Sequence, residues 1–425
     1  MKHIAIVGLG YVGLPLALQF ARSGAKVLGL DIDSKKTGAI LAGRSYIKHV
    51  TAEAISEAVG NGNLDASTDF SRVSEVDAVI LCVPTPLNQF REPDLSYVLE
   101  TGKTIAPHLQ EGAVVLLEST TYPGTTDTEL REVLEAGSGM KAGADFHLAF
   151  SPEREDPGNP DSKVADIPKV VGGLTPTCLA KATELYGIAI NNLVPVSSCR
   201  VAEATKLLEN IFRSVNIALV NELKVVYKEM GIDIWEVIEA AKTKPFGFMP
   251  FYPGPGLGGH CIPIDPFYLT WKAREFGQNT RFIELAGEIN TAMPDYVVKV
   301  CFEALNEEGK SIKGAKVLIL GLAYKANVDD DRESPTYKLI EKLEHLGAKV
   351  AYHDPHVPVI PMTREHAEYA GRKSVAEVSD DHDLILLSTG HQEYANFDFS
   401  GFNTPLVDTR NAVDPKLRPA KYYKA

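Results

Sequence analysis

The chain has 425 residues, of which 44% are hydrophobic and 23% are charged, which is typical of a globular protein and excludes a fibrous or largely disordered one. This length exceeds one ordinary hydrophobic core and predicts two or three domains. The 43 basic and 56 acidic side chains give a net charge of −13, which argues against a nucleic-acid partner, because phosphate backbones are held by an excess of lysine and arginine.

The first residues form an apolar strand pattern and not the pattern of a signal peptide, so we expect no secretory signal. No apolar run approaches the roughly 18 residues that span a bilayer, so we expect a cytoplasmic protein with no membrane partner. The five cysteines are scattered and never form a CxxC pair, which predicts reduced thiols and neither a disulfide framework nor a zinc site.

Residues 1–196 alternate short β-rich runs with amphipathic helical stretches, as at 12–23 and 95–108. Most of the runs are almost continuously apolar, which is typical of a parallel sheet covered on both faces. The pattern therefore predicts a doubly wound α/β domain. The clearest strands are expected at 3–8, 26–31, 77–84, 113–120 and 147–153.

Residues 197–309 read as mostly helical. One helix is predicted from Ser198 to Gly231, about 45 Å long at 1.5 Å per residue, and a second from Arg281 to Glu308 around Pro294. Alternation of strands and helices resumes over 310–425. We therefore predict an α/β protein with two Rossmann-like doubly wound domains, joined by a central helical region with one long helix.

The first strand leads into Gly8-Leu9-Gly10-Tyr11-Val12-Gly13, a GxGxxG pattern that opens a helix. Such glycines allow a tight turn, close approach of a pyrophosphate, and close packing of helix on strand. Asp31 ends the second strand, where an acidic group binds ribose hydroxyls and favours NAD over NADP. A glycine-rich turn without a ligand is the alternative.

Hydroxyl residues mark the ends of two further strands, with Thr85 after the strand at 77–84 and Ser119, Thr120 and Thr121 at the end of the strand at 113–120. Ligands of open α/β sheets bind at the carboxyl ends of strands, although serine and threonine are equally common in turns. Lys206 and Asn210 lie four residues apart on the long helix and project from one face. Their spacing alone favours a solvated polar face.

The loop from Tyr252 to Asp265 contains four glycines and three prolines around His260 and Cys261. A cysteine near a helix start gains thiolate character, which favours nucleophilic attack. His260 is read as a base or as a hydrogen-bonding loop residue. The remaining cysteines are read as buried and inert: Cys82, Cys178, Cys199 and Cys301. His353 and His356 flank Asp354 without further ligands, so we expect no metal.

Seven motifs occur in order along the whole chain: GLGYVGLPLA, CVPTPL, ESTTYPGTT, SPERED, EATKLLEN, GPGLGGHCIPIDP and GLAYKANVDDDRESP. In this order they resemble the UDP-glucose/UDP-N-acetylhexosamine 6-dehydrogenase family. The resemblance implies an NAD-binding Rossmann domain over 1–196, a central dimerisation and catalytic-cysteine region over 197–309, and a UDP-sugar-binding domain over 310–425. It also implies a homodimer.

The resemblance implies a four-electron oxidation of the sugar C6 hydroxyl to a carboxylate, with two NAD⁺ and a thiohemiacetal and thioester on Cys261. Implied catalytic residues are Cys261, Lys206, Asn210, Asp265, Glu153 and Thr120. Implied cofactor contacts are Gly8, Gly10, Tyr11, Val12, Gly13, Asp31, Thr85, Thr120 and Arg332. Implied substrate contacts are Arg154, Lys206, Asn210, Tyr252, Gly256, Gly258, Lys325 and Arg410.

Two differences from UDP-glucose dehydrogenases indicate the subgroup of the family. UDP-glucose dehydrogenases resemble this chain but carry a serine at the position of His260 and a lysine at that of Ile264. We therefore expect a UDP-N-acetylhexosamine substrate, UDP-GlcNAc first, for bacterial surface polysaccharide synthesis. UDP-glucose, UDP-ManNAc and UDP-GalNAc remain alternatives, as do a two-electron β-hydroxyacid dehydrogenase and a non-catalytic nucleotide-sugar sensor. The arginine that the UDP-glucose branch donates across its dimer has no match near Lys242–Lys244.

Overall fold

The computed structural model describes residues 3–47, 50–88, 92–154, 165–259, 262, 264–362 and 366–425. The chain forms two compact units: Met1–Glu209 with Phe267–Asn279, and Asn210–Pro266 with Thr280–Ala425. The long helix α7 (Cys199–Glu229) begins in the first unit and continues into the second. None of the helices in the described ranges is both long enough and apolar enough to cross a membrane.

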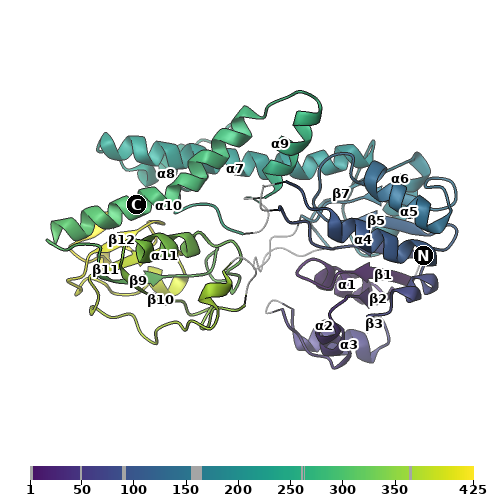
Figure 1. The fold of residues 1–425 in the computed structure, drawn as a ribbon, viewed down its shortest axis with the longest axis horizontal. Helices are drawn as coiled ribbons and strands as arrows, with labels where there is room; N and C mark the ends of the chain where they lie inside the picture. Colours follow the sequence, from purple (N-terminus) through teal and green to yellow (C-terminus); the bar gives the residue numbers. More distant parts are fainter. Residues whose placement is uncertain are drawn as a thin grey trace. The chain divides into compact units, whose positions relative to one another are not determined.

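The first unit is built on an eight-stranded sheet (Figure 1). In spatial order the strands are β3 (Leu64–Ser67), β2 (Lys26–Leu30), β1 (His3–Val7), β4 (Ala78–Leu81), β5 (Val114–Leu117), β6 (His147–Phe150), β7 (Lys169–Gly173) and β8 (Leu193–Val196). Neighbours are parallel except β6 and β7. The first six strands have the order of dinucleotide-binding folds, in which the ligand lies where the order reverses, here between β1 and β4.

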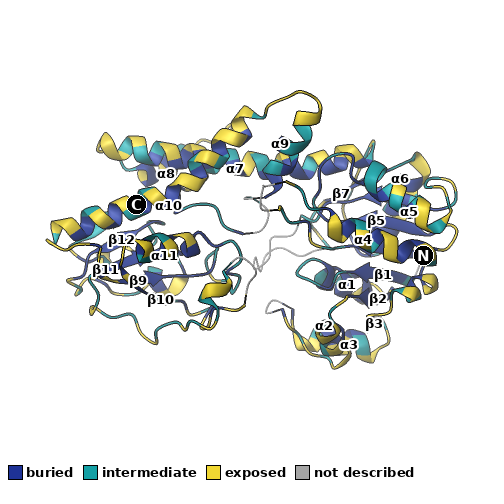
Figure 2. Ribbon diagram, in the orientation of Figure 1, coloured by how far each residue is buried: buried dark blue, intermediate teal, exposed yellow. Residues whose placement is uncertain are grey.

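Both faces of this sheet are buried, which explains the continuous apolar runs (Figure 2). Along β1, Ile4 and Ile6 belong to one core cluster, whereas Ala5 and Val7 belong to the cluster on the other face. The helices of this unit are α1 (Gly13–Arg22), α2 (Ser34–Leu41), α3 (Ala52–Gly60), α4 (Ser96–Ile105), α5 (Arg131–Ser138) and α6 (Pro176–Tyr186). Helix α9 (Asp265–Glu275) lies mostly in this unit.

The second unit contains a parallel five-stranded sheet. In spatial order the strands are β10 (Lys349–His353), β9 (Lys316–Leu320), β11 (Leu384–Leu387), β12 (Leu406–Asp408) and β13 (Tyr422–Lys424). Its helices are α8 (Ile234–Lys242), α10 (Arg281–Glu307), α11 (Pro335–His345) and α12 (Gln392–Ala395), besides the larger part of α7. This is the second common doubly wound order, with its switch point between β9 and β11.

The two sheets repeat one local geometry at the end of the first strand. Gly8 follows β1 with φ +91° and donates its N–H to Leu30 O at 2.8 Å. Gly321 follows β9 with φ +88° and donates its N–H to His353 O at 2.9 Å. The predicted fold class, with two Rossmann-like domains and one long helix, is therefore confirmed. Four short strands were not predicted: β3, β7, β8 and β13.

Candidate functional site

The three glycines of the first turn have different surroundings. A Cβ on Gly8 would lie 2.6 Å from the carbonyl oxygen of Cys82, and one on Gly13 would lie 1.9 Å from that of Gly8. A Cβ on Gly10 would meet nothing within 4 Å. Gly8 and Gly13 therefore serve the packing of α1 on the sheet, whereas Gly10 borders open space before a helix start. That arrangement fits the pyrophosphate of NAD.

Asp31 lies at the carboxyl end of β2, as predicted, and is buried. Its Oδ2 accepts the N–H of Leu9 at 2.9 Å and pairs with Lys36 Nζ at 3.0 Å. Tyr46 donates its hydroxyl to Leu9 O at 2.6 Å, so the glycine turn is held from both sides. Two further residues of the turn are half-buried: Tyr11 and Val12.

The loops after β4 and β5 are joined to each other. Ser119 Oγ donates to Val83 O at 2.5 Å, and the carbonyl of buried Thr85 accepts the hydroxyl of Tyr268 at 2.7 Å. Thr120 is half-buried beside them. These hydroxyl residues lie at the carboxyl edge of the sheet, next to the glycine turn, as the sequence predicts.

Glu203, which was not predicted, ties α7 to the loop after β5. Its carboxylate accepts the N–H of Gly124 at 2.7 Å, the N–H of Thr126 at 2.9 Å and the Thr126 hydroxyl at 2.7 Å. Burial raises the pKa of Glu203 to about 7, while these donors oppose that shift. An acidic residue three positions before Lys206 was the only sequence signal for it.

A buried polar cluster lies at the carboxyl end of β5. Glu118, the last residue before Ser119, pairs with Lys169 and accepts the hydroxyl of Tyr186 at 2.5 Å. Burial raises the pKa of Tyr186 well above its usual value, which keeps its phenol protonated and donating. The cluster anchors the carboxyl end of β5 to β7 and α6.

Lys206 and the SPER segment meet within the first unit. The Lys206 ammonium donates to the carbonyl of Glu153 at 2.5 Å and lies 3.4 Å from its carboxylate. Arg154 pairs with Glu209 at 2.6 Å and donates to Pro168 O at 2.6 Å. Of the predicted site residues, Lys206 therefore lies on α7, and Glu153 and Arg154 contact this helix.

Asn210 and Asp265 meet within the second unit, where Asn210 Nδ2 donates to Asp265 Oδ2 at 2.6 Å. Both side chains are buried. Helix α9 begins at Asp265, four residues after Cys261. The predicted nucleophile Cys261 and its neighbour His260 lie outside the described residues. The remaining cysteines Cys178, Cys199 and Cys301 are buried, and Cys82 is half-buried.

The glycines before Cys261 permit close packing. A Cβ on Gly258 or on Gly259 would lie 2.9 Å from the nearest side-chain atom of Tyr324. Gly256 adopts φ +142°, and a Cβ there would lie 3.1 Å from Pro335. The loop therefore lies against the segment that follows β9 and leads into α11. That segment carries Lys325, so predicted substrate residues gather at this edge of the second sheet.

Three other predicted contacts have partners of their own. Arg410 donates its Nε–H to Ser388 O at 3.0 Å, and burial lowers its pKa to about 10. Tyr252 stacks on Trp235 with ring centroids 5.9 Å apart. Arg332 pairs with Asp330, two residues before it, at 2.6 Å. The structure thus gives Tyr252 and Arg332 local partners and leaves their predicted ligand contacts as proposals.

A group of possible metal ligands lies in the second unit. His356, His391 and Glu393 cluster within 4.8 Å, but His391 accepts the Asn327 N–H at Nδ1 and contacts Asp354 through Nε2, so both its nitrogens are engaged.

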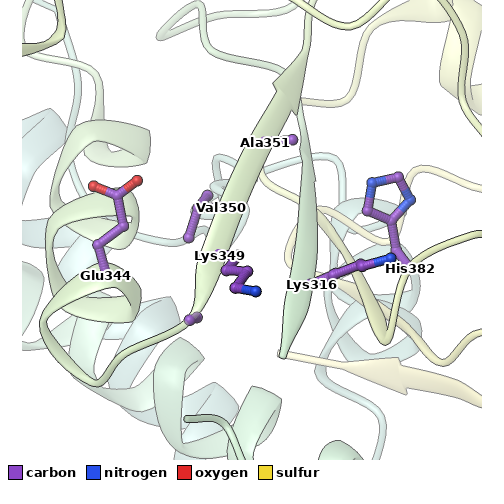
Figure 3. A pocket seen from close by; sticks show the side chains of 7 residues that line it. Lys316, Glu344, Lys349, Val350, Ala351 and His382 are labelled. Atoms are coloured by element: carbon purple, nitrogen blue, oxygen red, sulfur yellow. The ribbon is translucent and has the colours of Figure 1, made fainter. Parts of the chain in front are cut away.

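A cavity of about 600 Å³ lies where β9 and β10 begin (Figure 3). Its polar lining residues are Lys316, Glu344, Lys349 and His382. It occupies the amino ends of these strands, opposite the edge that carries Lys325.

Three domain models of one family match the chain. They are described as the UDP-glucose/GDP-mannose dehydrogenase family NAD binding domain over 2–190, central domain over 200–292, and UDP binding domain over 318–415. The first match confirms NAD as the predicted cofactor.

Similar proteins cover nearly the whole chain. UDP-N-acetyl-D-glucosamine 6-dehydrogenase of Salmonella typhi is 36% identical over 94% of this chain and 93% of its own length. NDP-N-acetyl-D-galactosaminuronic acid dehydrogenase of Ralstonia solanacearum is 34% identical over 98% and 97%. The solved structure of UDP-D-ManNAc dehydrogenase from Pyrococcus horikoshii matches with a TM-score of 0.90 and 32% identity, covering 99% and 98%. The chain therefore belongs to the UDP-glucose/GDP-mannose dehydrogenase family, as its motifs predict, and is an NAD-dependent dehydrogenase of UDP-sugars.

Proposed function

We propose that the protein oxidises the C6 hydroxyl of a UDP-N-acetylhexosamine to the uronic acid, for bacterial surface polysaccharide synthesis. The preferred substrate in this proposal is UDP-GlcNAc. The observation that carries the proposal is the pairing on α7, where Lys206 contacts Glu153 and Asn210, one turn later, contacts Asp265. Each donor is buried beside a carboxylate. A buried donor can stabilise a developing oxyanion, and the carboxylate beside it can accept a proton.

Oxidation of one R–CH₂OH by two NAD⁺ with one water gives R–COO⁻, two NADH and three protons. Bound NAD⁺ would accept a hydride from C6 in each of the two oxidations. The thiolate of Cys261 attacks the intermediate aldehyde, so that a C–S bond forms and the aldehyde cannot escape. Oxidation of this thiohemiacetal gives a thioester, and water then breaks the C–S bond and restores the thiol.

The remaining groups act on charge and protons. Lys206 and Asn210 donate hydrogen bonds to the oxygen that becomes negative when sulfur or water adds to carbon. Glu153 and Asp265 accept protons from the hydroxyl or from the attacking water. Thr120 and Thr85 lie at the sheet edge where NAD would bind, and Lys325 and Arg410 would hold the UDP group. The residues GGHC and Ile264 support the N-acetylhexosamine branch.

Substrate choice is tested by NADH formation with UDP-GlcNAc, UDP-GalNAc, UDP-ManNAc and UDP-glucose at equal concentration. We expect UDP-GlcNAc to give the highest kcat/KM. A higher value for UDP-glucose would contradict the assignment to this branch, and one for UDP-ManNAc or UDP-GalNAc would correct the sugar. Cys261→Ser should abolish formation of the acid. Acid formation at the wild-type rate would refute the thioester route.

We also propose a homodimer that pairs through α7. Five large apolar side chains on this helix are exposed: Val201, Leu208, Phe212, Leu219 and Val226. Their spacings of seven and four residues place them along one face, and a stripe of this length requires a partner in water. A second copy of the chain supplies an equal stripe. Light scattering at micromolar concentration should give twice the chain mass, and Leu208→Asp should give a monomer; a monomeric wild type would refute the pairing.

A further inference from the structure

Gly254 opens the glycine loop, and one turn of α7 holds both polar groups of this residue. Its N–H donates to Asn221 Oδ1 at 3.0 Å, and its carbonyl accepts from Lys224 Nζ at 3.3 Å. Asn221 and Lys224 are three residues apart and therefore lie on the same face of the helix. Asn221 is fully buried, and only 5% of Lys224 is exposed.

Asn221 is itself fixed by a second amide. Its Nδ2 donates to Asn290 Oδ1 at 3.0 Å, and Asn290 Nδ2 donates to Ser214 O at 3.1 Å. Asn290 is buried on α10. Because each amide uses both a donor and an acceptor, the orientation of Asn221 toward Gly254 is determined by the network.

Lys224 is buried on α7. Among the described residues no acidic side chain lies within ion-pair distance of it. Its ammonium faces the Tyr296 ring of α10 at 5.1 Å and the charges of Arg410 and Lys228. Burial, together with these charges, lowers the pKa of Lys224 to about 7. A cation buried in this way opposes stability, which favours a role for Lys224 in substrate binding.

The Gly254 residue also determines where Arg410 lies. A Cβ on Gly254 would be 2.4 Å from Arg410 Nη1, so the guanidinium packs directly on the glycine. From Gly254 the chain continues through Gly256 and Gly258, which pack against Pro335. A displacement of Gly254 would therefore move both the guanidinium and the start of the loop that leads to Cys261.

We infer that Asn221 and Lys224 are positioning residues for the UDP-sugar, which act by fixing Gly254 and, through it, the glycine loop and Arg410. The inference rests on the proposed function in one respect, that Arg410 and the loop contact the UDP group. It assigns to α7 a second role, about three turns or more beyond Lys206 and Asn210. Neither Asn221 nor Lys224 touches the reacting atoms.

The test uses UDP as the probe, because its binding does not depend on which sugar is oxidised or on turnover. Calorimetry on the full chain compares the wild type with Lys224→Met, which keeps an unbranched apolar side chain out to Cε and removes the ammonium. Lys228→Met is the matched control, since Lys228 lies one turn away, faces the same Tyr296 ring at 5.5 Å, and pairs with Glu303. Lys224→Arg tests for rescue by a second cation.

We expect Lys224→Met to lower the affinity for UDP at least tenfold, with an unchanged affinity for NAD⁺ and no fall in thermal midpoint. In Lys228→Met the affinity for UDP should stay within twofold of the wild type. Lys224→Arg should recover most of the loss. Equal weakening by both methionine variants, or none by Lys224→Met, would overturn the inference. If Lys224→Met does not fold, Gly254→Ala takes its place, because it displaces Arg410 and leaves both α7 residues intact; wild-type UDP affinity in that variant would overturn the inference as well.

Discussion

Gly10 and Gly13 lie three residues apart in one turn, and the structure assigns them separable roles. In Gly13→Ala the new Cβ would lie 1.9 Å from the Gly8 carbonyl oxygen. That oxygen cannot move aside freely, because the Gly8 N–H is bonded to Leu30 O. Helix α1 must therefore shift on the sheet, and overpacking of this kind costs about 1–3 kcal/mol. At roughly 2–4 °C per kcal/mol for a domain of this size, the thermal midpoint should fall by several degrees.

Gly10→Ala should behave in the opposite way. Its Cβ would enter open space, so the free energy of unfolding should change by no more than about 0.5 kcal/mol. The same methyl would stand between the turn and the pyrophosphate of NAD⁺, and would cost at least one hydrogen bond to a charged acceptor, about 1.5–3 kcal/mol. That corresponds to a roughly 10- to 150-fold increase in Kd for NAD⁺.

Calorimetric titration of NAD⁺ and thermal unfolding of the two variants provide the comparison. We expect a folded Gly10→Ala protein that binds NAD⁺ poorly and a destabilised Gly13→Ala protein. Binding of NAD⁺ by Gly10→Ala within twofold of the wild type, or unfolding of both variants at the same lowered temperature, would refute the assignment of separate roles.

Three further changes test buried polar groups, each by urea unfolding. Tyr186→Phe removes the hydroxyl that Glu118 accepts and should lower the free energy of unfolding by about 1.5–3 kcal/mol; a change below 0.5 kcal/mol would be inconsistent with the buried pairing. Burial opposes the charge of Asp354, but the hydrogen bond from His391 and two backbone amides outweigh it and lower its pKa to about 2. The ionised carboxylate therefore contributes about 2 kcal/mol to the free energy of unfolding above pH 4, and this contribution is lost as pH falls toward 2. Asp354→Asn should be less stable than the wild type at pH 7 and should lose less stability between pH 4 and pH 2. Parallel pH profiles would contradict this. Glu203→Ala strands two buried amide donors and should cost about 2–4 kcal/mol, whereas wild-type stability would show that the loop needs no such anchor.

Much of the fold was predictable because its signals are local. A strand buried on both faces must be apolar at nearly every position, and β1, β4 and β5 are. The glycine turn and the stop of α7 before Gly231 likewise depend on neighbours in sequence. Two of the missed strands lack this signal, since β8 is largely exposed and contains Pro195, and β13 has three residues at a sheet edge.

The pairings in the site could not be predicted in the same way. Asn210 and Asp265 are 55 residues apart, and nothing near either one indicates the other. Glu203 and Lys224 resemble solvent-facing charges on an amphipathic helix, yet both are buried, because packing of distant segments covers them. A sequence period places a residue on a face, whereas the partner of that face is decided by tertiary structure.

The most direct test of the central claim is the ratio of NADH formed to sugar acid formed with UDP-GlcNAc as substrate, measured by absorbance and by mass spectrometry of the product. A four-electron oxidation through Cys261 predicts two NADH for each molecule of uronic acid, with no aldehyde released. One NADH for each molecule of product, with an aldehyde or ketone accumulating, would contradict the account.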